Sequence, residues 1–235
     1  RICEPEKWNA YIREKVKLLK EKYKQKAEHI PVLPNQITVE DIKEYVSSID
    51  KLPVGIFKTS LNLATYDFKS NLINIISGKN IDIVAEYITH LYEELKMLPE
   101  VEVTVFDTEG IIQDLRKNIK LDYQNYSLKI QNNLSKKKQN VCIILGIDKF
   151  LVNVESGVLP DLRKAEELKN YTFIIADSVF KLKNHEYDDW YKEYITKDSG
   201  IWVGNGISDQ YLIRLNSSNR NLVNNCGESF GYLVK

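Results

Sequence analysis

The feature that most constrains the fold is a series of short apolar runs, rich in β-branched residues, between residues 72 and 176. Turn residues and then a segment of helical periodicity follow most of these runs. The runs lie at residues 72–76, 101–106, 141–145 and 171–176. Strands joined through helices form right-handed crossovers and pair in parallel. We therefore predict an α/β fold, with a mainly parallel sheet and helices on both of its faces.

Helical segments are expected between and after these runs, at residues 81–98, 121–134, 161–168 and 187–195. Two further segments, residues 53–57 and 61–68, have the pattern of a strand pair joined by a turn. Short strands or turns are expected at residues 201–203 and 211–213.

The N-terminal part of the chain has a different pattern. Residues 4–28 predict an amphipathic helix, whose apolar side chains recur three or four positions apart at Trp8, Ile12, Val16, Leu19 and Tyr23. A stiff connector at residues 31–34 follows, and Thr38 with Asp41 predicts a capping box that begins a short helix ending near residue 49. We expect residues 1–52 to form an N-terminal helical extension and connector, and residues 53–235 to form the main domain.

The charge balance bears on the choice of partner. Lysine plus arginine and aspartate plus glutamate number 33 each, so the chain exerts no long-range attraction on nucleic acid, and we expect no nucleic-acid partner.

Three scattered cysteines indicate no disulfide framework and favour a cytosolic setting. No apolar stretch approaches the roughly 20 residues that span a bilayer. Because the chain begins at Arg1 without a Met, we expect a piece of a longer protein.

The turn after the first apolar run has the outline of a nucleotide-binding loop. Residues 76–85 lead from the expected strand into the expected helix, where a P-loop reads G-x-x-x-x-G-K-S/T. Counted from Gly78, the second glycine, the lysine and the hydroxyl residue are replaced by Ile83, Val84 and Ala85. These side chains suit a helix packed on a sheet, and the phosphate cradle and the Mg²⁺ ligand are both missing.

The remnant of this motif consists of Ser77, Gly78 and Lys79. Lys79 stands too early in the motif to reach a γ-phosphate from the start of the helix, and Asp82 would place negative charge where phosphates bind. We expect ATP and Mg²⁺ to bind only if this degenerate site still holds them. We assign no catalytic residue and no metal site.

An acidic residue at the end of the run 141–145 would be needed to hold Mg²⁺ and to orient water. Gly146 and Ile147 occupy that place, and Asp148 comes two positions late. Asp148 is either a displaced acidic residue of the nucleotide site or a helix N-cap. The three histidines lie far apart in sequence and show no metal-ligand spacing.

Aromatic residues in the last third of the chain give a second candidate site. Trp190 and Tyr191 are flanked by acidic residues and suit the role of partner-binding anchors. The alternative is a helix start, where acidic residues interact favourably with the helix dipole. Arg214 and Arg220 are candidates for an arginine contact across a subunit interface.

With these residues in place, the chain resembles the last cytoplasmic ATPase domain of EssC-type proteins, the FtsK/SpoIIIE-like motors of bacterial type VII secretion systems. The resemblance covers nearly the whole chain. It rests on the order and spacing of short segments at residues 31–34, 52–56, 75–78, 105–107, 173–177 and 200–206.

The resemblance implies a RecA-like P-loop NTPase fold in the cytoplasmic part of a bacterial cell-membrane-anchored protein with tandem ATPase domains. It also implies a hexamer of the full-length protein. The partners that it implies are secreted type VII substrate proteins and the neighbouring ATPase domains of the same chain. The departures at Ile83, Val84, Ala85 and Gly146 put hydrolysis by this domain in doubt.

Three functions stay open on the sequence. The leading hypothesis is a pseudo-ATPase domain that docks secretion substrates or neighbouring motor domains. The second is a weak ATPase that uses Lys79 and Asp148 from unusual positions. The third is a DNA translocase module, against which the zero net charge argues.

Overall fold

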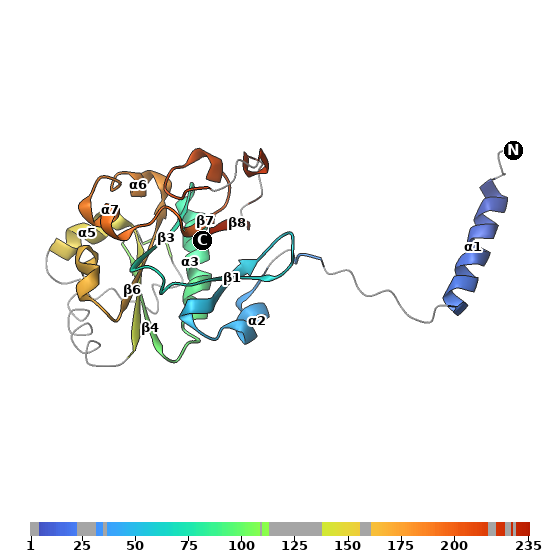
Figure 1. Cartoon of the computed structure of the whole chain (residues 1–235), viewed down its shortest axis with the longest axis horizontal. Coiled ribbons are helices and arrows are strands. Elements are labelled where there is room, and N and C mark those ends of the chain that lie inside the picture. The colour runs from blue at the N-terminus through green and yellow to red at the C-terminus, as the bar shows by residue number, and fades with distance from the viewer. Residues whose placement is uncertain are drawn as a thin grey trace. The chain divides into compact units, whose positions relative to one another are not determined.

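The computed structural model describes residues 5–22, 32–34, 37–108, 110–112, 138–155, 161–215, 220–223, 227 and 229–235. The chain divides into two compact units, Arg1–Leu33 and Pro34–Lys235 (Figure 1). The first contains helix α1, Pro5–Lys22, which confirms the predicted helix over these residues, while residues 23–28 lie outside the described part. Its apolar side chains, among them Trp8 and Leu19, are exposed.

The second unit begins with the predicted capping box. Asp41 Oδ2 accepts hydrogen bonds from the Thr38 N–H (2.8 Å) and from Thr38 Oγ1 (2.7 Å), and helix α2 follows at Val39–Ile42. The helix is shorter than expected: a 3₁₀ turn, Lys43–Tyr45, ends it, and a second 3₁₀ turn, η2, forms at Ile49–Lys51. Ser48, a poor residue for a helix interior, has an extended backbone between them. Ile49 and Leu52 are buried in the core of this unit.

The centre of the second unit is a six-stranded sheet with the strand order β4-β5-β6-β3-β7-β8 (Figure 1). All neighbouring strands pair in parallel except β7 and β8, which are antiparallel. The strands are β3 (Ile73–Gly78), β4 (Val101–Asp107), β5 (Gln139–Leu145), β6 (Tyr171–Ser178), β7 (Gly200–Val203) and β8 (Gly231–Val234). A separate antiparallel pair consists of β1 (Leu52–Ile56) and β2 (Leu63–Tyr66).

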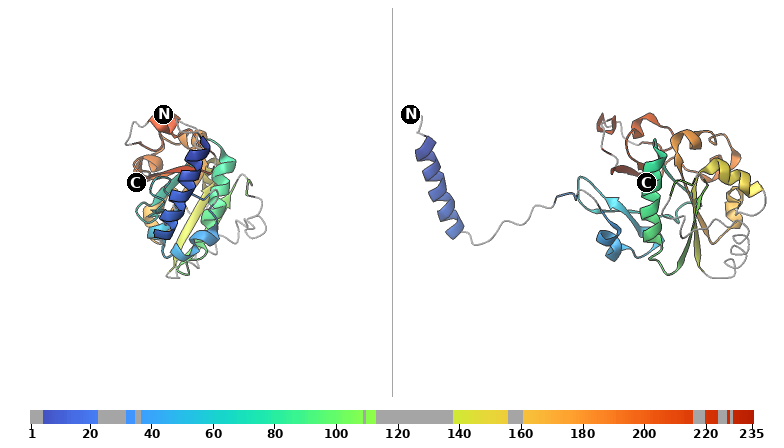
Figure 2. Two further views of the ribbon diagram at one scale, coloured as in Figure 1. Left: turned by 90° about the vertical axis from the view of Figure 1, so that its right-hand side faces the viewer. Right: turned by 180° about the vertical axis from the view of Figure 1, so that it is seen from behind.

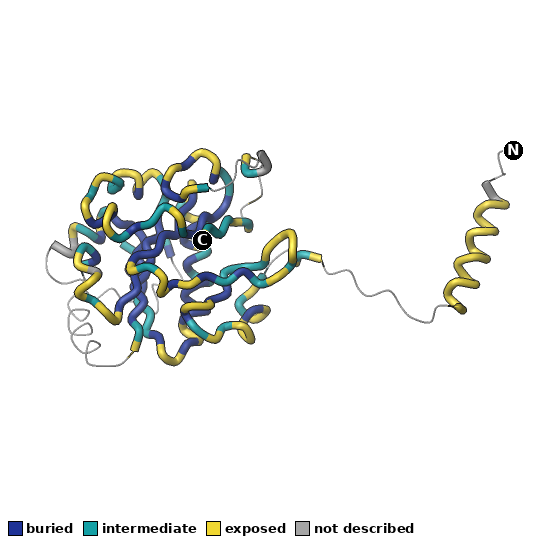
Figure 3. Tube along the Cα trace, in the orientation of Figure 1, coloured by how far each residue is buried: buried dark blue, intermediate teal, exposed yellow. Residues whose placement is uncertain are grey.

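Side chains of the central strands alternate between two cores, one on each face of the sheet. In β5, Val141, Ile143 and Leu145 enter the core on the side of helix α3 (Ile81–Leu95), here called the α3-side core. Cys142 and Ile144 enter the core on the side of helix α5 (Ile147–Glu155), called the α5-side core. Burial on both faces explains why these strands are apolar almost throughout (Figure 3). The predicted α/β class, with a mainly parallel sheet and helices on both faces, is confirmed.

Helix α3, Ile81–Leu95, and the β1–β2 pair cover the α3-side core. On the opposite face lie α5 (Ile147–Glu155), η4 (Leu162–Glu167), α6 (Val179–Lys183) and α7 (Asp189–Tyr194) (Figure 2). Asn74, a buried polar residue of β3, joins the sheet to the strand pair, because it accepts a hydrogen bond from Tyr66 Oη (3.3 Å) and donates one to the Phe68 carbonyl (3.0 Å).

Several predicted elements differ from the structure. Where a helix was expected at residues 161–168, Leu162–Glu167 form a 3₁₀ segment with a non-helical kink at Lys164, and residues 211–213 form no strand. The helix expected at residues 121–134 lies outside the described residues. The sequence did not predict α5, α6 or β8, which are short. None of the described helices combines the length and the apolar character needed to cross a bilayer.

Candidate functional site

The carboxyl edge of the parallel sheet is the place where this topology puts a ligand. β3 lies between β6 and β7, and the helices that follow β3 and β6 lie on opposite faces of the sheet (Figures 1 and 2). Such a reversal of crossover direction opens a crevice beyond the carboxyl ends of the strands. The candidate site therefore consists of the turns that follow β3, β5, β6 and β7.

The turn after β3 is only two residues long. β3 ends at Gly78 and α3 begins at Ile81, so Lys79 and Asn80 make the whole connection. Asn80 is the N-cap of α3, and its Oδ1 accepts a hydrogen bond from the Asp82 N–H (2.9 Å). The cap therefore occupies one of the N–H groups that a helix N-terminus would offer to an anion.

The three positions that replace the P-loop signature lie inside α3. Ile83, Val84 and Ala85 belong to its first turns, and Val84 and Ala85 are buried in the α3-side core. A lysine or a serine at these places would need space that the core now fills. The loop of a P-loop nucleotide site, with its row of free N–H groups, is absent from this described turn.

Gly78 and Ser77 are used for packing. A Cβ atom on Gly78 would lie 2.6 Å from the Val203 carbonyl oxygen and 3.1 Å from Val84 Cγ2, so the glycine is needed for the close approach of β7 and α3. Ser77 is buried, and its Oγ donates a hydrogen bond to the Asp177 carbonyl (2.9 Å). Both residues thus hold neighbouring strands together at the carboxyl edge.

Lys79 joins the turn after β3 to the loop after β7. Its Nζ lies 2.5 Å from Asp209 Oδ2, in the 3₁₀ turn η5 (Ile207–Asp209). The hydrogen bond from Lys79 is the largest effect that lowers the pKa of Asp209. The lysine stem crosses Gly206, where an added Cβ would overlap Lys79 Cε. The cation is therefore bound to a carboxylate on the neighbouring loop.

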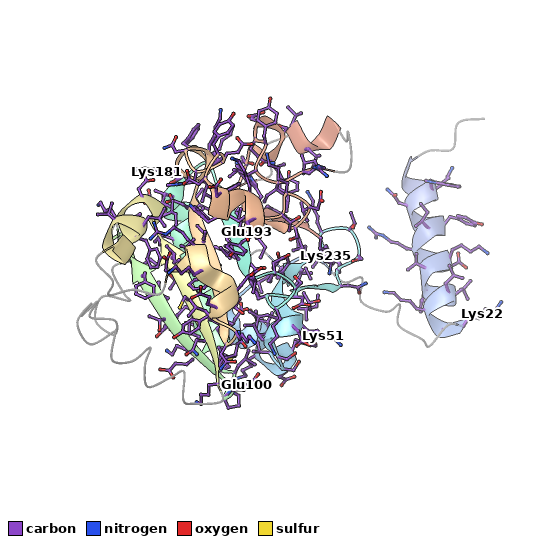
Figure 4. All side chains as sticks on the ribbon, turned by 60° about the vertical axis from the view of Figure 1, so that its left-hand side comes forward. Lys22, Lys51, Glu100, Lys181, Glu193 and Lys235 are labelled. Atoms are coloured by element: carbon purple, nitrogen blue, oxygen red, sulfur yellow. The ribbon has the colours of Figure 1, made fainter. Side chains whose placement is uncertain are left out.

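Asp148 lies in the first turn of α5 and contacts the side chains of His185 and Lys181. Its Oδ1 lies 2.7 Å from His185 Nε2, and its Oδ2 lies 3.0 Å from Lys181 Nζ (Lys181 is labelled in Figure 4). Desolvation raises the pKa of Asp148, but the hydrogen bonds from His185 and Lys181 outweigh it, and the net shift is downward. The predicted N-cap role is wrong, because Asp148 is the second residue of the helix.

The N-terminus of α5 is capped from β6 instead. The Asp177 side chain accepts hydrogen bonds from the Ile147 N–H (Oδ2, 3.0 Å) and from the Ser178 N–H (Oδ1, 2.7 Å). Burial raises the pKa of Asp177, and these two N–H groups oppose the effect. Sequence reasoning did not select Asp177 as a site residue, although it is the first acidic residue after the buried run 171–176.

The aromatic candidates are placed in the core. Trp190 and Tyr191 are only 6% and 2% exposed and belong to the α5-side core. Their role as partner anchors stays a prediction, and it would require both side chains to leave the core. The sequence also missed His185, which makes close contacts with Asp148 and Asp188, because 37 residues separate His185 from Asp148.

Within the part of the chain that the structure describes, no group of three or more His, Cys, Asp or Glu side chains has an arrangement that could hold a metal ion. Arg214 pairs with Asp198 (2.9 Å) at an exposed position, and Arg220 begins a short 3₁₀ segment, so their predicted contact with a neighbouring subunit stays a prediction.

Solved structures with the same architecture identify the class of fold. No model of a known protein family matches the sequence. The cytoplasmic domain of EssC superposes with a TM-score of 0.62 at 13% identity, over 100% of this chain and 52% of that one. The cytoplasmic domain of the Thermomonospora curvata type VII secretion ATPase EccC gives 0.61 at 14% identity, over 99% of this chain and 30% of that one. This chain has the fold of a type VII secretion ATPase domain.

A second structure of Thermomonospora curvata EccC and one sequence relative were also found. ATPases 2 and 3 of Thermomonospora curvata EccC, solved in complex with a signal sequence peptide, give a TM-score of 0.59 at 14% identity over 94% of this chain and 45% of that one. An uncharacterized ATP-binding protein of Methanocaldococcus jannaschii is 28% identical over 157 residues, which are 64% of this chain and 42% of that protein. The chain thus spans about half or less of each of these relatives.

Proposed function

We propose that this chain is a degenerate, final ATPase domain of a type VII secretion motor, which acts in protein export by binding secreted proteins or neighbouring ATPase domains and does not hydrolyse ATP. The observation that carries the proposal is the two-residue turn between β3 and α3, whose lysine is bound to Asp209. Phosphate binding needs a longer loop with free N–H groups and a free cation.

Several parts of a nucleotide site are missing together at the carboxyl edge of the sheet. Val84 and Ala85 fill the α3-side core where the P-loop lysine and hydroxyl would stand, and Asp148 is bound by His185 and Lys181. Ser77 and Gly78 pack β3 against its neighbours. A motor with one damaged residue would keep the other parts of the site, so the pattern favours a scaffold that is kept for its contacts.

Partner and location follow from the relatives as part of the same proposal. The EccC structure with a signal sequence peptide supports secreted proteins as the partner class, and its ATPases 2 and 3 support contacts with neighbouring ATPase domains. The domain would lie in the cytoplasm, in a protein anchored to the bacterial membrane by segments beyond this chain.

Peptide binding tests the interaction role. A fluorescent signal-sequence peptide of a type VII substrate from the same organism would be titrated with the chain, with and without ATP and Mg²⁺, and followed by fluorescence anisotropy. We expect saturable binding with the same dissociation constant in both buffers. A peptide of scrambled sequence is the control and should not bind. The absence of saturable binding would contradict the proposed binding of secreted proteins, and binding that requires ATP would contradict the proposed loss of nucleotide binding.

A weak ATPase is the second candidate, and the likeness to an ATP-binding protein favours it. In that case Lys79 would leave Asp209 and contact phosphate, and Asp148 would act on Mg²⁺. Lys79→Ala would then abolish phosphate release, whereas unchanged phosphate release would reject this candidate. A DNA translocase module, the third candidate, requires salt-dependent binding of duplex DNA by the chain.

A further inference from the structure

Helix α1 (Pro5–Lys22) carries a broad apolar face that is exposed. Residues 7–22 are exposed throughout (Figure 3), and the other residues that the structure describes in this unit, 32 and 33, form neither helix nor strand. An exposed apolar face of this kind marks a contact with a protein or with a membrane. The apolar side chains share one side of the helix, and they are Trp8, Tyr11, Ile12, Val16, Leu18 and Leu19.

The other side of α1 is basic. Arg13, Lys17 and Lys20 follow one another at spacings of four and three residues and form a row along the helix. We call these three residues the basic row. The helix as a whole has six basic and three acidic side chains. Its polar side therefore suits an anionic partner.

The charges of the chain are divided between its two units. Residues 1–33 contain nine basic and five acidic side chains, whereas residues 34–235 contain 24 basic and 28 acidic ones. The neutral chain thus consists of a positively charged helical unit and a negatively charged main domain. An anionic surface attracts the first unit and repels the second.

The position of Lys15 favours lipid over protein as the cover of the apolar face. Its neighbours on the helix surface, three and four positions away, are all apolar: Tyr11, Ile12, Leu18 and Leu19. Lys15 Nζ lies 5.5 Å from the centre of the Tyr11 ring. A dry protein groove would enclose this ammonium group and would need a paired carboxylate to offset its desolvation. At a membrane surface, the lysine stem stays on the apolar side while the ammonium group reaches the lipid phosphates.

We propose that α1 lies flat on the surface of an anionic membrane, with its apolar face among the acyl chains and its basic row against the lipid phosphates. The rings of Trp8 and Tyr11 stack at 5.7 Å, and both side chains are of the amphipathic kind that favours the boundary between headgroups and acyl chains. Charged residues occur along the whole length of α1, so the helix binds the surface and does not span the bilayer. The proposal does not rest on the proposed role in secretion.

Cosedimentation of the whole chain with vesicles tests this proposal. The vesicles consist of phosphatidylcholine alone or of phosphatidylcholine mixed with phosphatidylglycerol. We expect the chain to bind the mixed vesicles, and to bind phosphatidylcholine alone roughly tenfold more weakly. Raising the salt concentration from about 0.1 M to about 1 M should release the chain from the mixed vesicles.

Tryptophan fluorescence reports which part of the chain enters the lipid. Trp8 is 54% exposed, whereas Trp190 and Trp202 are buried. Transfer of Trp8 from water to the acyl chains should therefore shift the emission to shorter wavelength when mixed vesicles are added. Trp8→Phe is the control and should show no shift.

Variants at exposed positions separate the two faces of α1. Leu19→Glu places a negative charge on the apolar face and should abolish binding to the mixed vesicles. Val152→Glu, the same kind of change at an exposed position of α5, should bind like the wild type. Lys20→Glu, in the basic row, should weaken binding roughly tenfold, whereas Lys69→Glu, at an exposed position of the main domain, should not. Circular dichroism checks that each variant is folded.

Three results would overturn the proposal. The first is that the chain binds neither kind of vesicle, or binds both equally well. The second is that Leu19→Glu or Lys20→Glu binds like the wild type. The third is that sedimentation velocity without vesicles shows a dimer that Leu19→Glu dissociates, because a second copy of the chain would then cover the apolar face.

Discussion

Lys79 Nζ and Asp209 Oδ2 lie 2.5 Å apart, although 130 residues separate them in the sequence. The ion pair connects the turn after β3 to the loop after β7, across the edge of the sheet where a nucleotide would bind. The lysine that looks like a remnant of a P-loop is thus a link between two loops. The consequence is that its removal should affect stability slightly and chemistry not at all.

Lys79→Ala should lower the free energy of unfolding by less than about 1 kcal/mol, because the side chains are 43% and 61% exposed and water screens the pair. Phosphate release should equal the buffer background in both proteins. Urea unfolding and a colorimetric phosphate assay measure the two quantities. Lys96→Ala, which removes the similarly exposed pair with Glu93, is the matched control. A loss of phosphate release in Lys79→Ala alone would show that the wild-type protein turns over ATP.

Gly206→Ala should destabilise the protein by roughly 2 kcal/mol, because the residue has a left-handed backbone (φ 83°) and its new Cβ would overlap the stem of Lys79. Gly204→Ala is the control for the backbone alone, since its φ is 77° but its nearest neighbour, Ile83 Cδ1, lies 3.7 Å from the added atom. In thermal unfolding, the Tm of Gly206→Ala should be lower than the Tm of Gly204→Ala. Adding Lys79→Ala should restore part of the stability that Gly206→Ala loses, and none of the stability that Gly204→Ala loses. If the two single glycine variants lose equal stability, Lys79 does not cover this loop.

Glu94 predicts a pH-dependent stability. Burial in α3 raises its pKa from 4.5 to about 8, and its Oε2 makes no hydrogen bond within the described residues. The folded chain therefore keeps a proton that the unfolded chain releases above pH 4.5. The stability from this group is complete below pH 4.5 and is lost as the pH rises to about 8, at up to roughly 1.4 kcal/mol per pH unit.

Glu94→Gln should remove this slope. The free energy of unfolding of the variant should exceed that of the wild type at pH 8.5, and the two values should approach each other near pH 5. Urea unfolding across this range provides the measurement, and Glu93→Gln, an exposed neighbour on the same helix, should keep the wild-type slope. A Glu94→Gln variant that follows the wild-type curve would show that the carboxyl group is hydrated in the folded state.

The strands of the sheet could be predicted from the sequence, because burial on both faces of the sheet makes each strand a continuous apolar run. The runs at residues 101–106, 141–145 and 171–176 each became a strand within two residues of the expected limits. Helices α5 and α6, with nine and five residues, are too short for their sequence pattern to separate a helix from a turn, and η4 was predicted as an α-helix because a kink at Lys164 cannot be read from composition. The capping box at Thr38 and Asp41 was found because its partners lie three residues apart.

The candidate site was less accessible to sequence reasoning, because its contacts join distant residues. Asp209, His185 and Asp177 complete the environment of Lys79 and Asp148, and no local pattern connects them. The aromatic pair Trp190 and Tyr191 has the composition of an interface, but tertiary packing buries it. The sequence assigned Gly78 to the remnant of a P-loop, whereas in the structure this glycine permits the close approach of Val203 and Val84.

Isothermal titration calorimetry of ATP into the chain, in the presence and absence of Mg²⁺, tests the proposed loss of nucleotide binding most directly. With a two-residue turn after β3 and Lys79 bound to Asp209, we expect no saturable heat in either buffer up to millimolar ATP. Saturable binding with a micromolar dissociation constant would contradict the proposal and would make the weak ATPase the leading interpretation.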